Sequence, residues 1–212
     1  MNLNAPISQS GSKSPFEYTG GNLALDFVNT VENRNNERRL EMLTDYGRML
    51  EWVQGERFMS PQSLNRLERL AREDPAQAQS VLRRTIRLRE ALHATFTAVV
   101  EERTIPGESL EILNAAVRES SMHARLIRSN GSLSWEWIEP DRHLDSMLWP
   151  VARAAAQLLT SSELQFVRFC ASDSCRWLFL DKTKNHRRRW CEMKTCGNRD
   201  KARRYYRRQQ AG

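Results

Sequence analysis

All four cysteines of this 212-residue chain lie near its C-terminus, as two pairs with the same internal spacing. Four residues separate Cys170 from Cys175, four separate Cys191 from Cys196, and 15 lie between the pairs. Zinc prefers four tetrahedral ligands, and each short loop can bring two thiolates to one side of the ion. Four thiolates leave no coordination position for water or substrate. The spacing therefore predicts one structural Zn²⁺.

Other uses of these cysteines fit the spacing less well. A thiol redox pair usually has two residues between its cysteines, although a disulfide could still form if zinc is lost. Unliganded buried cysteines would have no reason to occur as equally spaced pairs among polar residues. His186 lies between the pairs and could replace one ligand, yet it stands in KTKNHRRR, where a solvated loop is the expected setting.

The size of the cysteine module also favours a metal. Between the two cysteine pairs, its apolar residues are the short run WLFL at 177–180 and Trp190 beside the third cysteine. A segment of about 40 residues with so few core side chains rarely folds alone without a disulfide, a bound metal or another cross-link. Zinc can supply on the order of 10 kcal/mol to such small modules at neutral pH.

The positive charge of the chain is concentrated in the same region. Residues 168–212 hold 14 Lys and Arg against 4 Asp and Glu, a balance of +10, whereas residues 1–167 hold 19 against 22, a balance of −3. This asymmetry predicts a polyanionic partner for the tail alone. Nucleic-acid phosphate is the favoured partner, with an acidic lipid or an acidic protein as alternatives.

The segment after the last cysteine, GNRDKARRYYRRQQ, has the composition of a helix. At 100° per residue, one arc of about 100° holds four side chains that we expect to pack on the zinc module. These are Ala202, Tyr205, Tyr206 and Gln209. The predicted nucleic-acid-binding residues are Arg187, Arg188, Arg189, Arg199, Lys201, Arg203, Arg204, Arg207 and Arg208. If this helix enters a major groove, Arg199 and Arg203 near its start are placed to read bases.

Upstream of the module, residue periodicity predicts a mainly helical domain. Helices are expected at 23–31, 44–54, 61–73, 75–103, 109–120 and 143–161. Pro61 and Pro75 follow the capping residues Ser60 and Asp74, a pattern typical of helix starts. Alternation around Asn130 and Gly131 predicts a β-hairpin, and 164–169 reads as a strand leading to the first cysteine.

These residues carry two family resemblances. FLD at 179–181 and RRWCEMKTCGNRDKARRYYRR resemble the CGNR zinc-finger family, whose name corresponds here to Cys196, Gly197, Asn198 and Arg199. GGNLALDFVNTVENR resembles the opening of the ABATE domain, which accompanies this finger. The resemblance implies a zinc-binding and DNA-binding finger in a largely bacterial family of stress-induced transcription regulators.

Together, pattern and resemblance predict three segments. Residues 1–18 are a flexible N-terminus, 19–165 an ABATE-like helical sensor or dimerisation domain, and 166–212 the CGNR-type finger. The expected fold class is mainly α (α+β), with a small β-hairpin in the helical domain and a treble-clef-like four-cysteine zinc finger that ends in a basic helix. The predicted partners are DNA, a small-molecule effector and a second copy of the chain.

The helical domain offers one candidate ligand site. Asn22, Asp26, Asn29 and Arg34 could line it, but the favoured interpretation is that the first three cap a helix or bond neighbouring backbone. His93, His123 and His143 are scattered, and no spacing suggests a second metal. No nucleophile elbow, phosphate loop or HExxH motif is present, so we do not expect an enzyme.

The predicted function is a zinc-dependent DNA-binding transcription regulator. The alternative is a small-molecule-binding protein whose finger is an RNA- or protein-interaction module. The first residues lack the apolar core of a secretory signal, and the most apolar run, LWPVARAAAQLL, is interrupted by Arg153. We therefore expect a cytoplasmic protein without a membrane segment.

Overall fold

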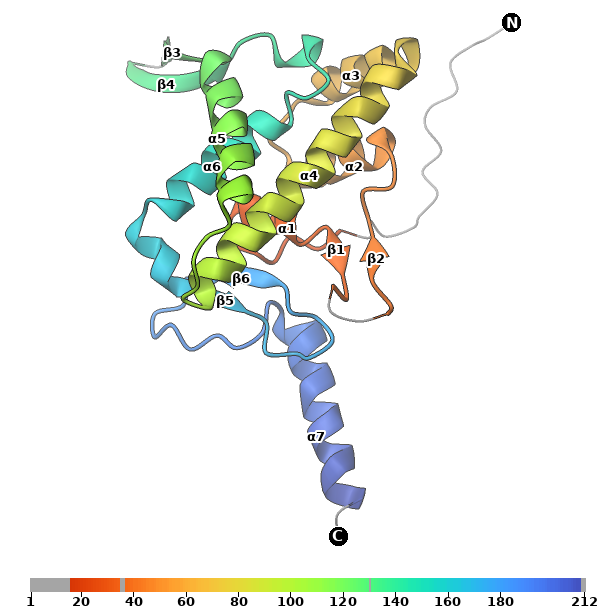
Figure 1. Cartoon of the computed structure of the whole chain (residues 1–212), viewed down its shortest axis with the longest axis vertical. Helices are drawn as coiled ribbons and strands as arrows, with labels where there is room; N and C mark the ends of the chain where they lie inside the picture. The colour runs from red at the N-terminus through yellow and green to blue at the C-terminus, as the bar shows by residue number, and fades with distance from the viewer. Residues whose placement is uncertain (1–15, 35–36, 130, 211–212) are drawn as a thin grey trace, which may run out of the picture.

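The structure, a computed structural model, describes residues 16–34, 37–129 and 131–210. A bundle of helices forms the body, and one long helix projects from it (Figure 1). The helices are α1 (Leu23–Val28), α2 (Tyr46–Glu56), α3 (Pro61–Glu73), α4 (Pro75–Val100), α5 (Gly107–Met122), α6 (Leu148–Leu159) and α7 (Asn198–Gln210). The predicted mainly helical class is confirmed. Within the described ranges, no helix combines the length and apolar character needed to cross a membrane.

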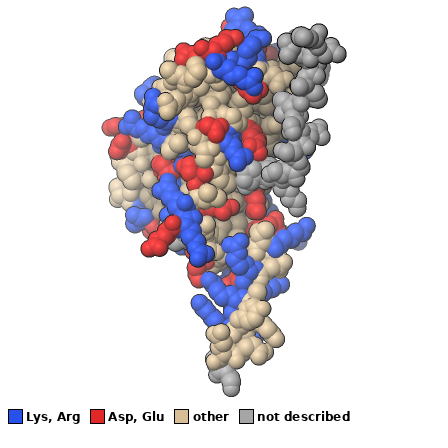
Figure 2. Space-filling view, turned by 90° about the vertical axis from the view of Figure 1, so that its right-hand side faces the viewer, with Lys and Arg blue, Asp and Glu red and all other residues tan. Residues whose placement is uncertain are grey.

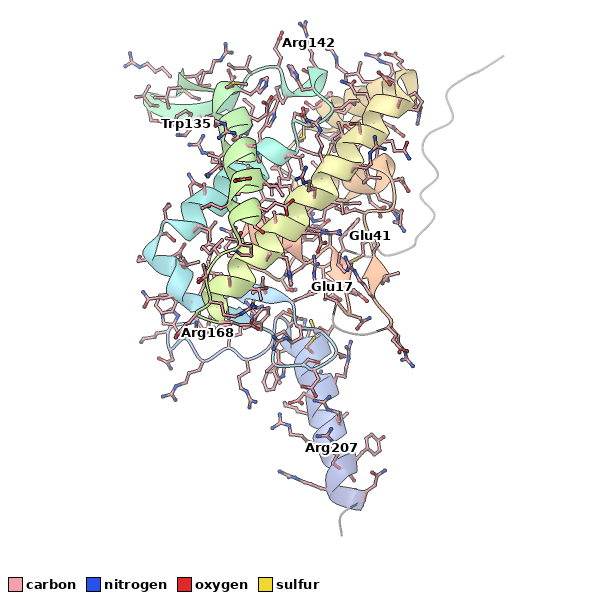
Figure 3. All side chains as sticks on the ribbon, in the orientation of Figure 1. Glu17, Glu41, Trp135, Arg142, Arg168 and Arg207 are labelled. Carbon is pink, nitrogen blue, oxygen red and sulfur yellow. The ribbon has the colours of Figure 1, made fainter. Side chains whose placement is uncertain are left out.

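Three two-stranded antiparallel sheets complete the fold. They are formed by β1 (Val31–Glu32) with β2 (Leu40–Glu41), β3 (Ala124–Ser129) with β4 (Ser132–Trp137), and β5 (Val167–Phe169) with β6 (Leu178–Leu180). The β3–β4 pair is the predicted hairpin, with Leu126 opposite Trp135 and Gly131 at φ +82° in its turn. Asn130, the other predicted turn residue, lies outside the described residues. Figure 3 shows Trp135 on the hairpin at the edge of the body, where Arg153 lies 4.0 Å above its ring.

Two helix starts have the predicted caps. Ser60 Oγ accepts a hydrogen bond from Ser63 N at 3.1 Å, and Asp74 Oδ1 accepts one from Gln77 N at 2.8 Å. Each cap satisfies one of the free N–H groups of the first turn, and the following proline has no N–H to satisfy. α4 ends at Val100, not near Arg103, because Glu102 takes a left-handed φ of 53°.

The first predicted helix is shorter than its apolar spacing suggested. α1 ends at Val28, and Val31 belongs to β1. The chain leaves the helix because the Asn29 side chain bonds to a distant strand and Thr30 Oγ1 donates back to Phe27 O at 2.8 Å. Apolar spacing could not reveal this, since Val31 is buried in either conformation.

Other boundaries also differ from those predicted. α2 begins at Tyr46, not at residue 44, and the Asp45 side chain caps it by accepting from Arg48 N. α6 begins at Leu148, after an irregular segment. Residues Ser162–Phe166 form a 3₁₀ turn, so β5 begins only at Val167.

The core surrounds α1, which packs against α4, α6 and β6. Arg89 of α4 is buried completely among these apolar side chains, and its two terminal nitrogens each donate to a Glu41 carboxylate oxygen at 2.5 Å. This bidentate pair ties α4 to β2 and satisfies a charge that would otherwise be costly to bury. Phe16 is also buried in the core, so the packed chain begins before residue 19, while residues 1–15 of the predicted flexible segment lie outside the described residues.

The finger shares this core with the helical body. Leu178 and Phe179 of β6 are fully buried, and Leu180 N donates to Gly20 O at 2.7 Å. Trp177 Nε1 donates to Val31 O at 2.9 Å. The sequence boundary at 165/166 therefore does not separate two packing units.

Candidate metal centre and nucleic-acid interface

The four cysteine sulfurs form one compact cluster. All four lie within 4.8 Å of one another, with Cys175 Sγ 3.6 Å from Cys191 Sγ, and Cys191 Sγ 3.7 Å from Cys196 Sγ. A tetrahedral zinc ion with Zn–S bonds of about 2.3 Å needs sulfurs about 3.8 Å apart. The donor set fits one structural Zn²⁺, as predicted, and the closed tetrahedron offers no position for substrate.

The thiols also need a cation if all four are to ionise. Hydrogen bonding between Cys170 and Cys175 lowers the pKa of the Cys170 thiol and raises the pKa of the Cys175 thiol, since a thiolate and a thiol share one proton. Four thiolates this close repel one another strongly, and a divalent ion removes that repulsion. A Zn²⁺ ion held by these four cysteines would take the place of the thiol protons.

The first pair of ligands comes from the turn between β5 and β6. Cys170 follows β5 directly, and its N–H donates to Trp177 O at 2.7 Å, while Cys175 N donates to Ser172 O at 3.0 Å. These bonds fold the short loop so that both sulfurs face the same point. The sheet therefore fixes one half of the site.

The second pair lies at the start of α7, where a π-helical turn covers Met193–Gly197. A Cβ at Gly197 would lie 2.4 Å from Met193 Sδ, so a larger residue here requires the Met193 side chain to move. Asn198 Nδ2 donates to Lys194 O at 3.0 Å and ties the turn to the helix. The arrangement of a hairpin pair and a helix-start pair is the treble-clef-like finger that we expected.

Asp181 organises the loop between the two ligand pairs. Its carboxylate accepts from Thr183 N at 3.0 Å, Thr183 Oγ1 at 2.6 Å and Arg188 N at 2.8 Å. Burial opposes ionisation of Asp181, but these donors lower its pKa below the ordinary value. His186 is exposed, as expected for its loop, and its ring stacks on Phe166 with centroids 3.6 Å apart; it does not belong to the cluster of four possible ligands.

Arg188, one of the predicted nucleic-acid-binding residues, is partly buried and bonds to other groups of the protein. Its guanidinium donates to Thr19 O at 3.0 Å, to Trp190 O at 3.0 Å and to Cys191 O, and it lies 4.6 Å above the Phe179 ring. The run of three arginines gave no sign that the middle one faces inward. Arg187 and Arg189 are exposed on either side of it.

α7 projects away from the body, contrary to the prediction that one of its faces packs on the zinc module. The helix has no buried residue, and Tyr205 and Tyr206 are 61% and 65% exposed. Figures 1 and 3 show the helix extending with no other element along its outer half, and the Arg207 side chain leaving it freely. The module is too small to cover a 13-residue helix, so the apolar arc has no surface to bury against.

The first turns of α7 are tied to the first loop of the finger. Arg199 Nη1 donates to Ser174 Oγ at 3.1 Å, and Arg203 forms ion pairs with Asp173 at 2.7 Å and Asp200 at 3.2 Å. Arg204 pairs with Asp200 at 2.7 Å. The two arginines predicted to read bases therefore also fix the direction of the helix.

Five of the nine predicted nucleic-acid-binding residues remain available to a partner. Each is exposed and forms neither an ion pair nor a side-chain hydrogen bond within the part of the chain that the structure describes. They are Arg187, Arg189, Lys201, Arg207 and Arg208. Figure 2 shows Lys and Arg side chains gathered where the projection leaves the body, whereas both signs are interspersed on the same face of the body.

The four residues of the candidate ligand site in the helical domain all bond to other groups of the protein. Asn22 Oδ1 caps α1 by accepting from Ala24 N, and Asp26 Oδ1 accepts from Gly20 N at 2.7 Å. Arg34 pairs with Glu90 at 2.6 Å and donates to Val28 O. These contacts match the backbone-bonding alternative for the polar residues of this motif.

Asn29 connects the helical body to the finger. Its Nδ2 donates to Leu178 O at 2.8 Å, and its Oδ1 accepts from Leu178 N at 3.0 Å. Both bonds are buried, and they join residues 149 positions apart. Nothing in the spacing around Asn29 pointed to residue 178, because a long-range contact leaves no periodic signal.

We expect Asn29→Ala to lower the free energy of unfolding by about 2–4 kcal/mol, since it leaves two buried backbone groups without partners. Asn22→Ala is the matched control and should cost only about 1 kcal/mol as a lost cap. Urea unfolding of both variants measures the difference. Equal losses of unfolding free energy in the two variants would contradict a stabilising role of the Asn29–Leu178 contact greater than that of a helix cap.

The buried Asp26 of α1 interacts electrostatically with the partly buried Glu56 of α2. Burial, reinforced by the charge of Asp26, raises the pKa of Glu56 from 4.5 to about 8, and Glu56 Oε1 has no hydrogen-bond partner among the described residues. Burial likewise raises the pKa of Asp26 to about 6, against the Gly20 hydrogen bond and the nearby charges of Arg188 and Lys182. The folded chain thus binds protons that the unfolded chain releases.

Stability should therefore fall as pH rises through the window between the unfolded and folded pKa values, from about 4.5 to about 8 for Glu56. Glu56→Gln should weaken this dependence between about pH 6 and about pH 8 and raise the melting temperature at the upper end of that window. Glu68→Gln, at an exposed partner of Arg72, is the control and should follow the wild type. A parallel pH profile for Glu56→Gln and the wild type would contradict this account.

The fold and the site define a zinc-finger protein in which a helical body carries a four-cysteine module and a basic helix. Residues 21–162 match the family model ABATE, described as "Putative stress-induced transcription regulator", and residues 167–209 match the CGNR zinc finger. The chain belongs to the ABATE family and carries a CGNR zinc finger. A search of curated proteins gave no significant match.

Proposed function

We propose that this protein is a zinc-dependent DNA-binding transcription regulator, in which α7 contacts duplex DNA and the helical body senses a signal or forms a dimer. The observation that carries the proposal is α7 itself: an exposed helix, held by the metal module, with unpaired cations along it. The family description, a stress-induced transcription regulator, supports the same role.

The energetics of α7 favour a partner on its surface. Helices of about 12–15 residues are marginal alone in water, and α7 has 13 residues and no buried side chain. Phosphates would neutralise the like charges that now repel one another along the helix. A helix of this diameter also fits the major groove of B-form DNA. We infer a binding role and not a catalytic one.

A salt titration with duplex DNA and with RNA of the same sequence tests the proposal. If the five unpaired cations each contact a phosphate, log K should fall with log salt at a slope of about −4.5 on duplex DNA. Selection of genomic fragments by the purified protein would then name the target. Tighter binding to RNA, or no duplex binding at low salt, would favour the alternative of an RNA- or protein-interaction module.

A further inference from the structure

In its first two turns, the arginine-rich side of α7 faces the rest of the finger. At about 100° per residue, four charged residues occupy one arc of about 140°. They are Arg199, Asp200, Arg203 and Arg204. Their side chains bond to Asp173 and Ser174 of the first finger loop or to one another, and the Arg204 guanidinium lies 6.0 Å from the centre of the Trp190 ring. This side of the helix is therefore already engaged where it leaves the body.

The opposite side of α7, which we call the tyrosine face, covers an arc of about 160°. Its residues, all exposed, are Lys201, Ala202, Tyr205, Tyr206, Arg208 and Gln209. Gln209 Nε2 donates to Tyr205 Oη at 3.3 Å, and the two tyrosine rings meet edge to face with centroids 5.9 Å apart. Within the described ranges, the side-chain hydrogen bonds and ring contacts of this face stay inside it. Figure 2 shows uncharged surface running along the projection beside Lys and Arg side chains.

The charge of the tyrosine face selects among partners. Lys201 and Arg208 lie together at one edge of the face, and the one acidic residue of α7, Asp200, lies in the other arc. A cationic partner would meet two positive charges and no carboxylate on this face, and a second copy of the face would bring like charges together. A polyanion meets neither obstacle, because its phosphates neutralise both cations.

We propose that α7 presents the tyrosine face, and not its arginine-rich side, to the major groove of duplex DNA. The rings of Tyr205 and Tyr206 lie against bases and sugars, and Lys201 and Arg208 contact phosphates. A tyrosine suits this position because its ring is apolar and its hydroxyl can bond to a phosphate, while the small Ala202 lets the helix approach a thymine methyl group. This assignment rests on the DNA-binding function proposed above and names the surface that performs it.

Tyr205→Ala combined with Tyr206→Ala tests the assignment in the zinc-loaded full chain. The probe is a labelled duplex of mixed sequence, several helical turns long, titrated at several salt concentrations. The double variant should bind about tenfold more weakly or worse, with an unchanged slope of log K against log salt, because no cation is removed. Alanine favours a helix more than tyrosine does, so unfolding of α7 cannot explain the loss. Gln210→Ala, on the same helix outside the face, is the control and should bind like the wild type.

Fluorine NMR of the chain labelled with fluorotyrosine locates the contact. The signals of Tyr205 and Tyr206 should shift when DNA is added, whereas those of Tyr18 and Tyr46, whose hydroxyls bond to backbone carbonyls of the body, should not. If the wild type binds DNA and the tyrosine variant binds equally well, the assignment fails and the proposed function stands. A wild type that binds no duplex refutes both. Tyrosine shifts that depend on protein concentration without DNA would show that a second copy covers the face, and would also overturn the assignment.

Discussion

Cys196→Ser should remove zinc from the protein and lower the melting temperature of the whole chain, not of the finger alone. Zinc supplies on the order of 10 kcal/mol to modules of this size. Because Leu178 and Phe179 are fully buried in the same core as the helices, the loss of the metal destabilises β6 and the body together. Metal analysis and a thermal melt measure both effects.

The control for this experiment is Lys194→Ala, which changes an exposed residue of the same turn without touching a ligand. It should retain one zinc per chain and the melting temperature of the wild type. A Cys196→Ser chain that keeps a folded finger without metal would contradict the structural role of zinc. Separate melting of an unaffected body would contradict the shared core.

Arg207→Ala combined with Arg208→Ala should weaken duplex DNA binding roughly tenfold or more and reduce the steepness of its salt dependence. Two fewer phosphate contacts lower the slope of log K against log salt by about 1.8. Both side chains are exposed and lack acidic partners within the described ranges, so the free energy of unfolding should not change. Fluorescence anisotropy at several salt concentrations measures the slope.

A matched double variant of the body provides the comparison. Arg69→Ala with Arg72→Ala removes the same charge from α3, where both arginines are paired with glutamates. Its DNA affinity and salt slope should remain those of the wild type. If both double variants lose affinity equally, net charge and not α7 determines binding.

The parts of the fold that depend on neighbouring residues could be predicted from the sequence. Cysteine spacing identified the metal ligands because each pair is closed by a short loop. The caps at Ser60 and Asp74 placed the starts of α3 and α4 because capping acts within one turn. The same local logic predicted the hairpin, since Gly131 takes the positive φ that its turn requires.

The contacts that join distant segments could not be predicted in this way. Asn29 bonds Leu178, and Arg188 bonds Thr19, across more than a hundred residues. Periodicity also predicted that one face of α7 packs on the module, which the structure does not show. An apolar arc indicates which side chains favour burial, but it does not indicate whether another element is present to cover them. Charge alone could not separate the inward-facing Arg188 from its exposed neighbours.

The most direct test of the central claim, that zinc holds a free basic helix in position to bind DNA, is duplex binding before and after removal of the metal. The zinc-loaded chain should bind duplex DNA at low salt, lose that binding when zinc is chelated and regain it when zinc is restored. Equal affinity with and without zinc, or no binding by the zinc-loaded chain, would contradict the account.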